Sequence, residues 1–218
     1  MKVKRLEKIY NNRFEDERSR AKIWQVLVGE FFQQYVNDHG AVLDLACGRG
    51  EFINTVRAKT KIAVDINEKN KKYIKRDIKF FRGSSTNMNF IRSSSLDQVF
   101  VSNFFEHIER GAIEKTVGEL YRILKKGGSV LVLQPNIRFI SRDYWMFFDH
   151  VTPVDDRALR EVFESYGFTL VKKIERFLPY TTKSRLPQFP FLVRLYLKLP
   201  LLWRVLGKQS FLVFEKST

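Results

Sequence analysis

The sequence predicts a layered α/β fold with a seven-stranded, mostly parallel sheet and helices on both of its faces. Two observations support this prediction. Short apolar segments alternate along the chain with longer charged or amphipathic segments, which is the pattern of successive strand–helix–strand units. The apolar segments are hydrophobic at consecutive positions rather than at alternate ones, as expected for strands that are covered on both faces.

The expected strands are short apolar runs, and the first two carry an acidic residue, Asp44 and Asp65 respectively. In chain order they are residues 41–46, 61–65, 78–81, 96–103, 129–136, 167–176 and 210–216. Because helical segments separate most of these strands, we expect their pairing to be mainly parallel.

The expected helices are recognised by their periodicity and by their ends. Residues 16–36 carry apolar side chains at every fourth position, from Ile23 to Tyr35, and a turn at Gly40 follows. Further helices are expected at residues 50–58, 67–77, 112–128 and 155–166. The third of these is amphipathic and closes with two glycines. An aromatic loop is expected at residues 139–153.

The length of 218 residues is sufficient for one domain with a full core. We expect a helical cap at residues 1–38, a core at 39–178, a basic apolar insertion at 179–209 and a last strand at 210–218. The single Cys47 excludes an internal disulfide, and neither a signal peptide nor a membrane span is recognisable. A reducing, cytoplasmic setting is therefore expected.

The net charge of +15 favours an anionic partner, which is nucleic acid, a membrane face or an anionic substrate. The charge is unevenly distributed, because no acidic residue lies between Glu175 and Glu215, whereas seven Lys and Arg residues do. All six prolines lie at or after Pro135. The last third of the chain therefore differs in character from the rest.

The turn after the first strand, VLDLACGRG at residues 42–50, combines a carboxylate with two glycines. In an open α/β sheet, ligands bind beyond the carboxyl ends of the strands. Gly48 and Gly50 let backbone N–H groups approach a ligand, and Asp44 favours a ligand of positive charge. A dinucleotide is disfavoured, because Ile53 stands where its motif needs a third glycine and because Asp44 would repel a pyrophosphate.

Three segments in order, VLDLACGRG, IAVDIN and ELYRILKKGGSVLVLQPN, resemble the motifs of class I S-adenosylmethionine-dependent methyltransferases. The resemblance covers about residues 20–175, and Ala46 stands where the family usually has its first glycine. It implies a Rossmann-like sheet with an antiparallel last strand, and S-adenosylmethionine as the cofactor.

The same resemblance implies roles for the residues in the first two motifs. Asp44 would hold the α-amino group of the cofactor, and the glycines would let its methionine portion lie against the backbone. Asp65 would accept both ribose hydroxyls, since one carboxylate takes two O–H donors. The cofactor-binding residues implied in this way are Asp44, Ala46, Gly48, Gly50, Asp65 and Ile66.

Three further residues complete the expected cofactor site. Ser84 or Ser85 would replace the acid that family members often place after the third strand for the adenine amino group, and Asn103 would line the methionine side. Structural roles are the alternatives: Asp44 would cap the next turn, Asp65 would cap the following helix, and Asn103 would close a turn.

The acceptor side is expected in the loop after the fifth strand. We expect His150 to act as the general base or as a ligand of the acceptor, with Asp149 orienting it, and His107 to face the same cleft. The alternatives are that His150 caps the next helix and that the Glu106–His107 pair is structural. His39 is expected at the surface, and the histidines and the cysteine are too scattered to predict a metal site.

The loop that carries His150 is rich in aromatic residues. Those that would wall an acceptor pocket are Tyr144, Trp145, Phe147 and Phe148. Aromatic side chains at this density are also typical of packed core, and we expect at least half of them there.

Residues 188–209 are apolar with interspersed bases, and Pro190 and Pro200 divide them into two short helical pieces. This composition is typical of a segment that binds at the headgroup boundary of an anionic membrane. The alternatives are that the segment forms a lid over the acceptor site or a dimer contact. Together with DHVTP and RFLPYTTKSRLP, the segment resembles bacterial methyltransferases that are encoded with polysaccharide-assembly enzymes. The bases of this segment are Arg194, Lys198, Arg204 and Lys208.

These observations predict methyl transfer to a small-molecule or lipid-linked acceptor, at an oxygen of a saccharide, in the cytoplasm or at the inner face of the membrane. RNA methylation is the alternative enzyme activity, favoured by the positive charge. Against it, no RNA-binding module is recognisable, and SNFFEH stands where base-amine methylating enzymes carry an Asn/Asp-Pro-Pro-Tyr-type motif. A cofactor-binding membrane adaptor without turnover is the alternative from another class. The oligomeric state is left open.

Overall fold

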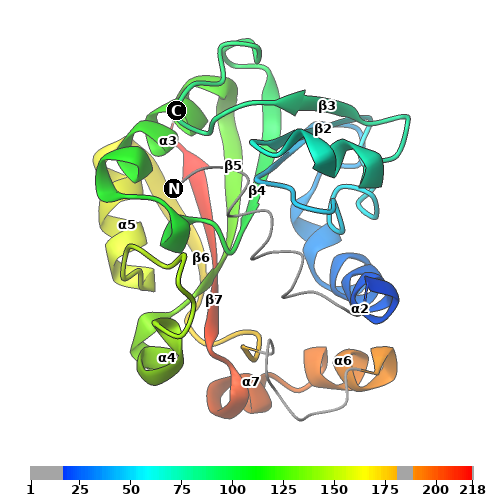
Figure 1. The fold of residues 1–218 in the computed structure, drawn as a ribbon, viewed down its shortest axis with the longest axis vertical. Helices are drawn as coiled ribbons and strands as arrows, with labels where there is room; N and C mark the ends of the chain where they lie inside the picture. Colours follow the sequence, from blue (N-terminus) through cyan, green and yellow to red (C-terminus); the bar gives the residue numbers. More distant parts are fainter. Residues whose placement is uncertain (1–16, 181–188, 218) are drawn as a thin grey trace.

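The computed structural model describes residues 17–180 and 189–217, and its strands form one seven-stranded sheet (Figure 1). The strands are β1 Ala41–Leu45, β2 Thr60–Asp65, β3 Lys79–Arg82, β4 Leu96–Ser102, β5 Leu124–Pro135, β6 Phe168–Ile174 and β7 Gln209–Lys216. Their order in the sheet is β3-β2-β1-β4-β5-β7-β6. The neighbours from β3 to β5 pair in parallel, and β7 is antiparallel to both β5 and β6. The predicted sheet, including its antiparallel last strand, is confirmed.

Helices cover both faces of the sheet, with α3 and α5 on one side and α2 and α6 on the other (Figure 1). The α-helices are α2 Glu17–Glu30, α3 Arg110–Ile123, α4 Ile137–Tyr144, α5 Asp156–Ser165, α6 Pro190–Leu197 and α7 Pro200–Leu206. The described part of the chain also contains the 3-10 helices η1 Phe32–Tyr35, η2 Glu68–Tyr73 and η3 Phe105–His107. Pro190 and Pro200 begin α6 and α7, which confirms the predicted division of the insertion. Residues 1–16 of the expected cap and 181–188 of the insertion lie outside the described residues.

The hydrophobic core consists of two layers, one on each face of the sheet. Leu43 and Leu45 point into the layer that α3 and α5 cover, whereas Val42 points into the layer with α2. All three are buried, because successive side chains of a strand face opposite sides and both sides are covered. This explains why β1 is apolar at consecutive positions.

The helix predicted at residues 50–58 is wrong, since a series of turns follows β1 instead. The backbone mixes i→i+4 and i→i+3 hydrogen bonds here, from Asn54 to Gly50 at 2.9 Å and from Thr55 to Phe52 at 2.9 Å. Two polar side chains also bond to the backbone: Thr55 donates to the Glu51 carbonyl, and Asn54 donates to the Tyr73 carbonyl, both at 2.8 Å. Such side-chain bonds compete with a regular helix.

Other element boundaries also differ from the prediction. The helix expected over residues 16–36 ends at Glu30, and the 3-10 helix η1 follows it. The charged segment 67–77 forms only the 3-10 helix η2. The helix expected to extend to residue 128 ends at Ile123, where the Lys216 ammonium donates to the carbonyls of Tyr121 at 2.7 Å and Leu124 at 2.9 Å. These bonds satisfy carbonyls at the helix end. The expected aromatic loop begins with α4, whose N-cap Asn136 accepts a hydrogen bond from the Arg138 N–H.

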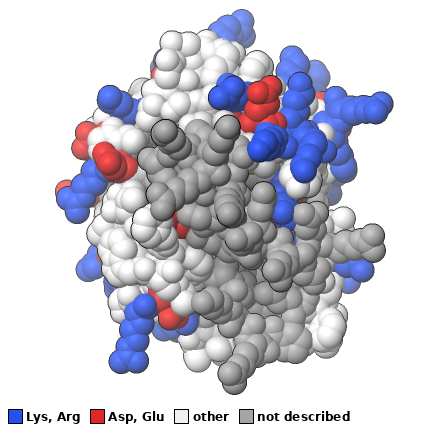
Figure 2. Space-filling view, viewed as in Figure 1, with Lys and Arg blue, Asp and Glu red and all other residues white. Residues whose placement is uncertain are grey.

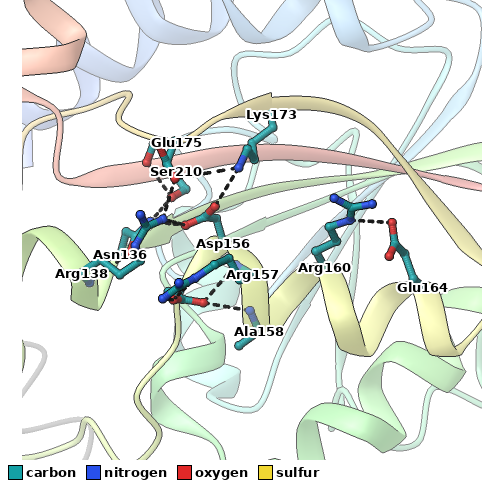
Figure 3. A network of polar contacts seen from close by, with 11 residues as sticks. Asn136, Arg138, Asp156, Arg157, Ala158, Arg160, Glu164, Lys173, Glu175 and Ser210 are labelled. Carbon is teal, nitrogen blue, oxygen red and sulfur yellow. Dashed lines mark hydrogen bonds and ion pairs between the residues drawn. The ribbon is translucent and has the colours of Figure 1, made fainter.

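A buried polar network fixes both ends of the segment that joins β5 to α5 (Figure 3). Asp156, at the start of α5, is 1% exposed. Its carboxylate accepts hydrogen bonds from Asn136 at 2.8 Å, Arg138 at 3.0 Å and Lys173 at 3.2 Å. Asn136 also donates to the hydroxyl of Ser210 on β7 at 2.8 Å. The network therefore ties α4 and α5 to β6 and β7, and it holds the loop between these helices.

Candidate active site

The predicted cofactor residues lie at or just beyond the carboxyl ends of β1, β2, β3 and β4, which are neighbours in the sheet. β1 has β2 on one side and β4 on the other, so the chain reverses its direction of crossover at β1. This topological switch point opens a crevice in which open α/β sheets bind their ligands.

The turn after β1 is built from residues in the left-handed region. Ala46, Gly48 and Gly50 have φ of 55°, 53° and 72°. A Cβ added to Gly48 would meet no atom within 4 Å, so the backbone faces open space at this point. At Gly50 a Cβ would come within 2.3 Å of Ile74, so this glycine is needed for packing. The turn thus presents bare backbone to a ligand at Gly48.

Ala46 is strained in this turn, because a positive φ is unfavourable for residues with a Cβ. We expect Ala46→Gly to raise the free energy of unfolding by up to about 1 kcal/mol. Glycine removes the cost of the left-handed conformation, but the greater conformational entropy of the unfolded chain offsets part of this gain. Urea unfolding measures the change. Ala21→Gly, on an exposed turn of α2, is the matched control and should lower the stability by about 1 kcal/mol. A loss of stability in both variants would contradict the strain at Ala46.

Asp65, at the end of β2, is held by two backbone donors. Its carboxylate accepts the Gly48 N–H and the Asn67 N–H, both at 2.8 Å. Burial raises the pKa of Asp65, and these hydrogen bonds oppose the rise. The alternative that Asp65 caps the following helix is wrong, because Asn67 is the N-cap of η2 and accepts the Lys69 N–H. The Asn70 side chain also hydrogen-bonds to Asp65. A carboxylate has about four acceptor positions, so a ribose diol would have to replace the Asn70 bond to place both of its hydroxyls here.

Asp44 is buried beneath the same turn, and two other carboxylates lie near it. Burial raises the pKa of Asp44 most, and the negative charges of Glu51 and Asp65 raise it further, whereas a hydrogen bond from the Ile53 backbone N–H opposes the rise. Asp44 therefore also caps the turn after β1, as the structural alternative expects. A ligand with an ammonium or sulfonium group would offset the repulsion among the carboxylates. The residues therefore fit S-adenosylmethionine. Glu51 was not recognised from the sequence, although its position directly after Gly50 was the available signal.

The remaining predicted cofactor residues are placed as follows. Ile66 is exposed next to Asp65. Ser85 is buried, and its hydroxyl pairs with that of Thr116 on α3 at 2.8 Å, whereas Ser84 is exposed. Asn103 has φ of 48°, and its amide donates to the Ser102 hydroxyl at 2.8 Å. Of the two serines, Ser84 is therefore the better placed to contact a nucleoside.

The predicted acceptor residues come together although they lie far apart in the chain. The Glu106 carbonyl on η3 accepts the N–H groups of Val151 at 2.8 Å and Thr152 at 3.2 Å, so the loop after α4 is held against η3. The ring centroids of His107 and His150 are consequently 4.9 Å apart. The alternative that His150 caps α5 is wrong, because the Asp155 side chain accepts the N–H groups at the start of that helix.

Asp149 lies beside His107. Its carboxylate Oδ2 is 3.2 Å from His107 Nδ1, and its backbone oxygen is 3.1 Å from the same nitrogen. On the other side of the ring, His107 Nε2 is 3.7 Å from Oε1 of the buried Glu106. Burial raises the pKa of Glu106, whereas His107 and a hydrogen bond from Gln134 lower it. Asp149 thus orients His107, in addition to the role that we expect for it beside His150.

Gln134 was not recognised from the sequence. Its amide donates to Glu106 Oε2 at 2.8 Å. The available signal was a polar residue at the end of the apolar run of β5. His39, by contrast, is exposed in the turn before β1, as expected.

The aromatic residues of the loop divide evenly between core and surface. Tyr144 and Phe147 are buried, and the Tyr144 hydroxyl donates to the Thr152 carbonyl at 2.6 Å. Trp145 and Phe148 are 52% and 74% exposed. Half of these residues therefore belong to the packing, as expected, and the other half face outwards.

Residues 16–173 match a family model described as a methyltransferase domain. The fold is similar to that of a SAM-dependent methyltransferase from Archaeoglobus fulgidus, with 21% identity, a TM-score of 0.67, and coverage of 90% of this chain and 94% of that one. A SAM-dependent methyltransferase from Thermotoga maritima has 17% identity and a TM-score of 0.67, with 94% and 97% covered. No curated protein matches the chain significantly by sequence.

A third solved structure is geranyl diphosphate C-methyltransferase from Streptomyces coelicolor, in complex with Mg²⁺, geranyl diphosphate and S-adenosyl-L-homocysteine. Its identity is 10% and its TM-score 0.62, with 85% of this chain and 75% of that one covered. The fold and the family match together define the class of this protein, and the chain belongs to the methyltransferase-domain family. It is an S-adenosylmethionine-dependent methyltransferase, the class that its first-turn motif predicts.

Proposed function

We propose that the protein transfers the methyl group of S-adenosylmethionine to an oxygen of a saccharide carried on a lipid, at an anionic membrane face. In this proposal Asp44 binds the amino group and Asp65 the ribose diol. Ala46, Gly48 and Gly50 border the methionine portion, and Ile66, Ser84 and Asn103 complete the nucleoside and methionine contacts. Ser85 lies behind Ser84, where it pairs with Thr116.

The chemistry is an in-line displacement. A lone pair of the acceptor oxygen attacks the methyl carbon, the carbon–sulfur bond breaks, and its electrons remain on the sulfur of S-adenosylhomocysteine. The hydroxyl proton passes to His150, with His107 and Asp149 positioning the acceptor side. Alignment of the oxygen with the methyl group supplies much of the rate, since the sulfonium already activates the carbon.

The proposal of a lipid-linked acceptor is supported by the outer side of α6 and α7, here called the α6–α7 surface. The inner side chains, among them Val193 and Trp203, pack on the core, and Arg194 pairs with Glu30 at 2.5 Å. Lys198 and Arg204 are exposed. The exposed apolar residues of this surface are Phe189, Phe191, Leu195, Leu199, Leu201, Leu202, Val205 and Leu206.

Apolar side chains interspersed with bases and without acids match an anionic headgroup layer. No helix among residues 17–180 and 189–217 is long and apolar enough to span a bilayer, so this proposal concerns contact with one face of the membrane. Figure 1 shows α4 at the same end of the molecule as α6 and α7. The acceptor loop that follows α4 therefore begins at this end.

A specific observation favours RNA as the second candidate acceptor. Figure 2 shows Lys and Arg side chains gathered on the side of the molecule that carries β2 and β3. The exposed bases of η2, β3 and the segment between them are Lys69, Lys71, Lys72, Lys75, Arg76, Lys79 and Arg82. A polyanion would bind such a face in a strongly salt-dependent manner.

Label transfer distinguishes the two acceptors. The protein is incubated with methyl-labelled S-adenosylmethionine and, in separate reactions, membrane lipid extract or total RNA. We expect label in the lipid fraction, in a form that mild acid converts to a water-soluble saccharide. Label in RNase-sensitive material would establish the RNA alternative instead.

Membrane docking predicts a loss of vesicle binding on charge reversal. Each base near an anionic surface contributes about 1 kcal/mol, so Lys198→Glu with Arg204→Glu should weaken flotation with phosphatidylserine vesicles at least roughly 30-fold. The matched control is Lys69→Glu with Lys72→Glu on the η2 face. Equal losses in both double variants, or no loss in the first, would contradict docking through the α6–α7 surface.

A further inference from the structure

Glu106, His107 and His150 bring three ligand atoms to within 4.8 Å of one another. From this geometry we propose that the three residues bind a divalent metal ion of the zinc or iron(II) type. Two imidazole nitrogens and one carboxylate oxygen are a ligand set typical of these ions, and three protein ligands leave a coordination position open. The sequence does not predict this cluster, because His150 lies far along the chain from Glu106 and His107.

One separation in the cluster is close to that between two ligands of a bound ion. Ligands at about 2.0–2.1 Å from a tetrahedral Zn²⁺ lie about 3.3 Å apart, and His107 Nε2 is 3.7 Å from Glu106 Oε1. These two atoms would therefore need to move a few tenths of an ångström closer together. The three ligand atoms lie within 4.8 Å of one another, so His150 would also have to move toward the other two.

The surroundings orient the ligands as metal sites do. Asp149 Oδ2 lies 3.2 Å from His107 Nδ1, which favours a proton on Nδ1 and leaves the lone pair of Nε2 facing Glu106. Carboxylate–histidine–metal arrangements of this kind fix the tautomer and raise the basicity of the ligand. Gln134 holds the other oxygen of Glu106 at 2.8 Å, so Oε1 is the oxygen that faces the histidines.

The fold rigidifies the cluster before any ion binds. The Thr152 hydroxyl donates to the Ile108 carbonyl at 2.7 Å, and the Tyr144 hydroxyl donates to the Thr152 carbonyl. The segment directly after His150 is thus fastened both to the end of η3 and to α4. Glu106 is 1% exposed, and an ionised carboxylate at such a depth is costly unless a positive charge compensates it. A divalent ion supplies that compensation.

The consequence for catalysis rests on the proposed transfer to an oxygen. An acceptor hydroxyl in the open position would lose its proton to solvent more easily, because a bound cation lowers the pKa of its oxygen ligands. The oxygen would then attack the methyl carbon as described above. With the ion bound, the proton that His150 accepts in the metal-free mechanism would pass to solvent, because both histidines would be ligands.

Binding of Zn²⁺ alone tests the site. Tag-free full-length chain, stripped with EDTA and dialysed, is titrated with ZnCl₂ in a calorimeter. We expect one Zn²⁺ per chain, with the binding lost in His150→Ala and in Glu106→Gln. Asp149→Asn should weaken it by roughly 10- to 100-fold, as removal of an outer-shell partner does. Titration with Co²⁺ should give a visible absorption band that His150→Ala abolishes.

His39→Ala is the matched control, because it removes the exposed histidine outside the cluster and should leave binding unchanged. Thermal unfolding followed by circular dichroism verifies that each variant is folded, and His150→Gln replaces His150→Ala if the latter is not. Failure of the wild-type chain to bind Zn²⁺ stoichiometrically, or binding that persists in both ligand variants, would overturn the site. Binding of S-adenosylhomocysteine without Zn²⁺ binding would overturn only the metal site, whereas the reverse would overturn the proposed function alone.

Discussion

Asp65→Asn should weaken the binding of S-adenosylhomocysteine about 100-fold. The substitution preserves the shape of the side chain but removes the charge that strengthens hydrogen bonds to the ribose hydroxyls. Two such bonds are together worth about 3 kcal/mol, which corresponds to roughly two decades in Kd. The new amide group would also face the Gly48 N–H, which now donates to Asp65 at 2.8 Å, so the turn that borders the methionine portion would be disturbed as well.

Isothermal titration calorimetry with S-adenosylhomocysteine measures this effect. Asp77→Asn is the matched control, because Asp77 is an exposed acid that pairs with Lys61 at 3.0 Å. It should bind as the wild type does. An unchanged affinity in Asp65→Asn would mean that the ribose lies elsewhere, and the assignment of the β2 carboxylate would have to be abandoned.

Asp156→Asn should lower the free energy of unfolding by about 2 kcal/mol at pH 7. Asp156 compensates Arg138 and Lys173 from inside the core (Figure 3). Breaking a buried pair of charges is strongly destabilising, but Arg138 and Lys173 are 32% and 45% exposed and can return to water, which reduces the loss. Urea denaturation with linear extrapolation measures the difference.

The same network predicts how this difference depends on pH. Burial raises the pKa of Asp156, but hydrogen bonds from Asn136, Lys173 and Arg138 outweigh it, and the pKa lies below its ordinary value of 3.8. A lowered pKa in the folded state contributes stability above the ordinary value, and this contribution is lost as the pH falls through the folded pKa. The difference in the free energy of unfolding between wild type and Asp156→Asn should therefore have its full size at pH 7 and become smaller below about pH 4.

Asp143→Asn provides the comparison for both measurements, since Asp143 is 51% exposed and lies 3.7 Å from Lys208. We expect its stability to differ little from that of the wild type at either pH. A gap for Asp156→Asn that stays constant from pH 7 to pH 3 would show that the charge of Asp156 is not what stabilises the network.

The sheet was predictable because its information is local. Each strand is an apolar run bounded by turn residues, and the alternation of strands with helical segments is sufficient to predict parallel pairing. A helix was wrongly predicted after β1, because the spacing of apolar residues there is helical. That spacing does not reveal the hydrogen bonds from the Asn54 and Thr55 side chains to the backbone, which compete with a regular helix. These bonds depend on where their acceptors lie in the fold, and one acceptor, the Tyr73 carbonyl, is too far along the chain for a local sequence pattern to indicate it.

The two halves of the candidate site differed in how far they could be predicted. Asp44, Gly48 and Asp65 lie at the ends of adjacent strands, so their meeting follows from the topology alone. Their proposed ligand follows from the charge of the carboxylates. On the acceptor side, the contact of Asp149 with His107 depends on how the loop after α4 folds back onto η3. Nothing in the local sequence encodes that distance.

By itself the sequence determined the order of the strands along the chain, their burial on both faces, the glycine turn and the acidic character of the crevice, because periodicity and composition act over a few residues. Only the tertiary structure decided which side chains from distant segments meet. The ligand atoms of Glu106 and His107 come close to that of His150 from a later loop. Asp156 holds α4 and α5 to β6 and β7 through a network that includes its hydrogen bonds with Asn136 and Lys173. Contacts of this kind arise from the packing of whole elements, and a local pattern does not contain them.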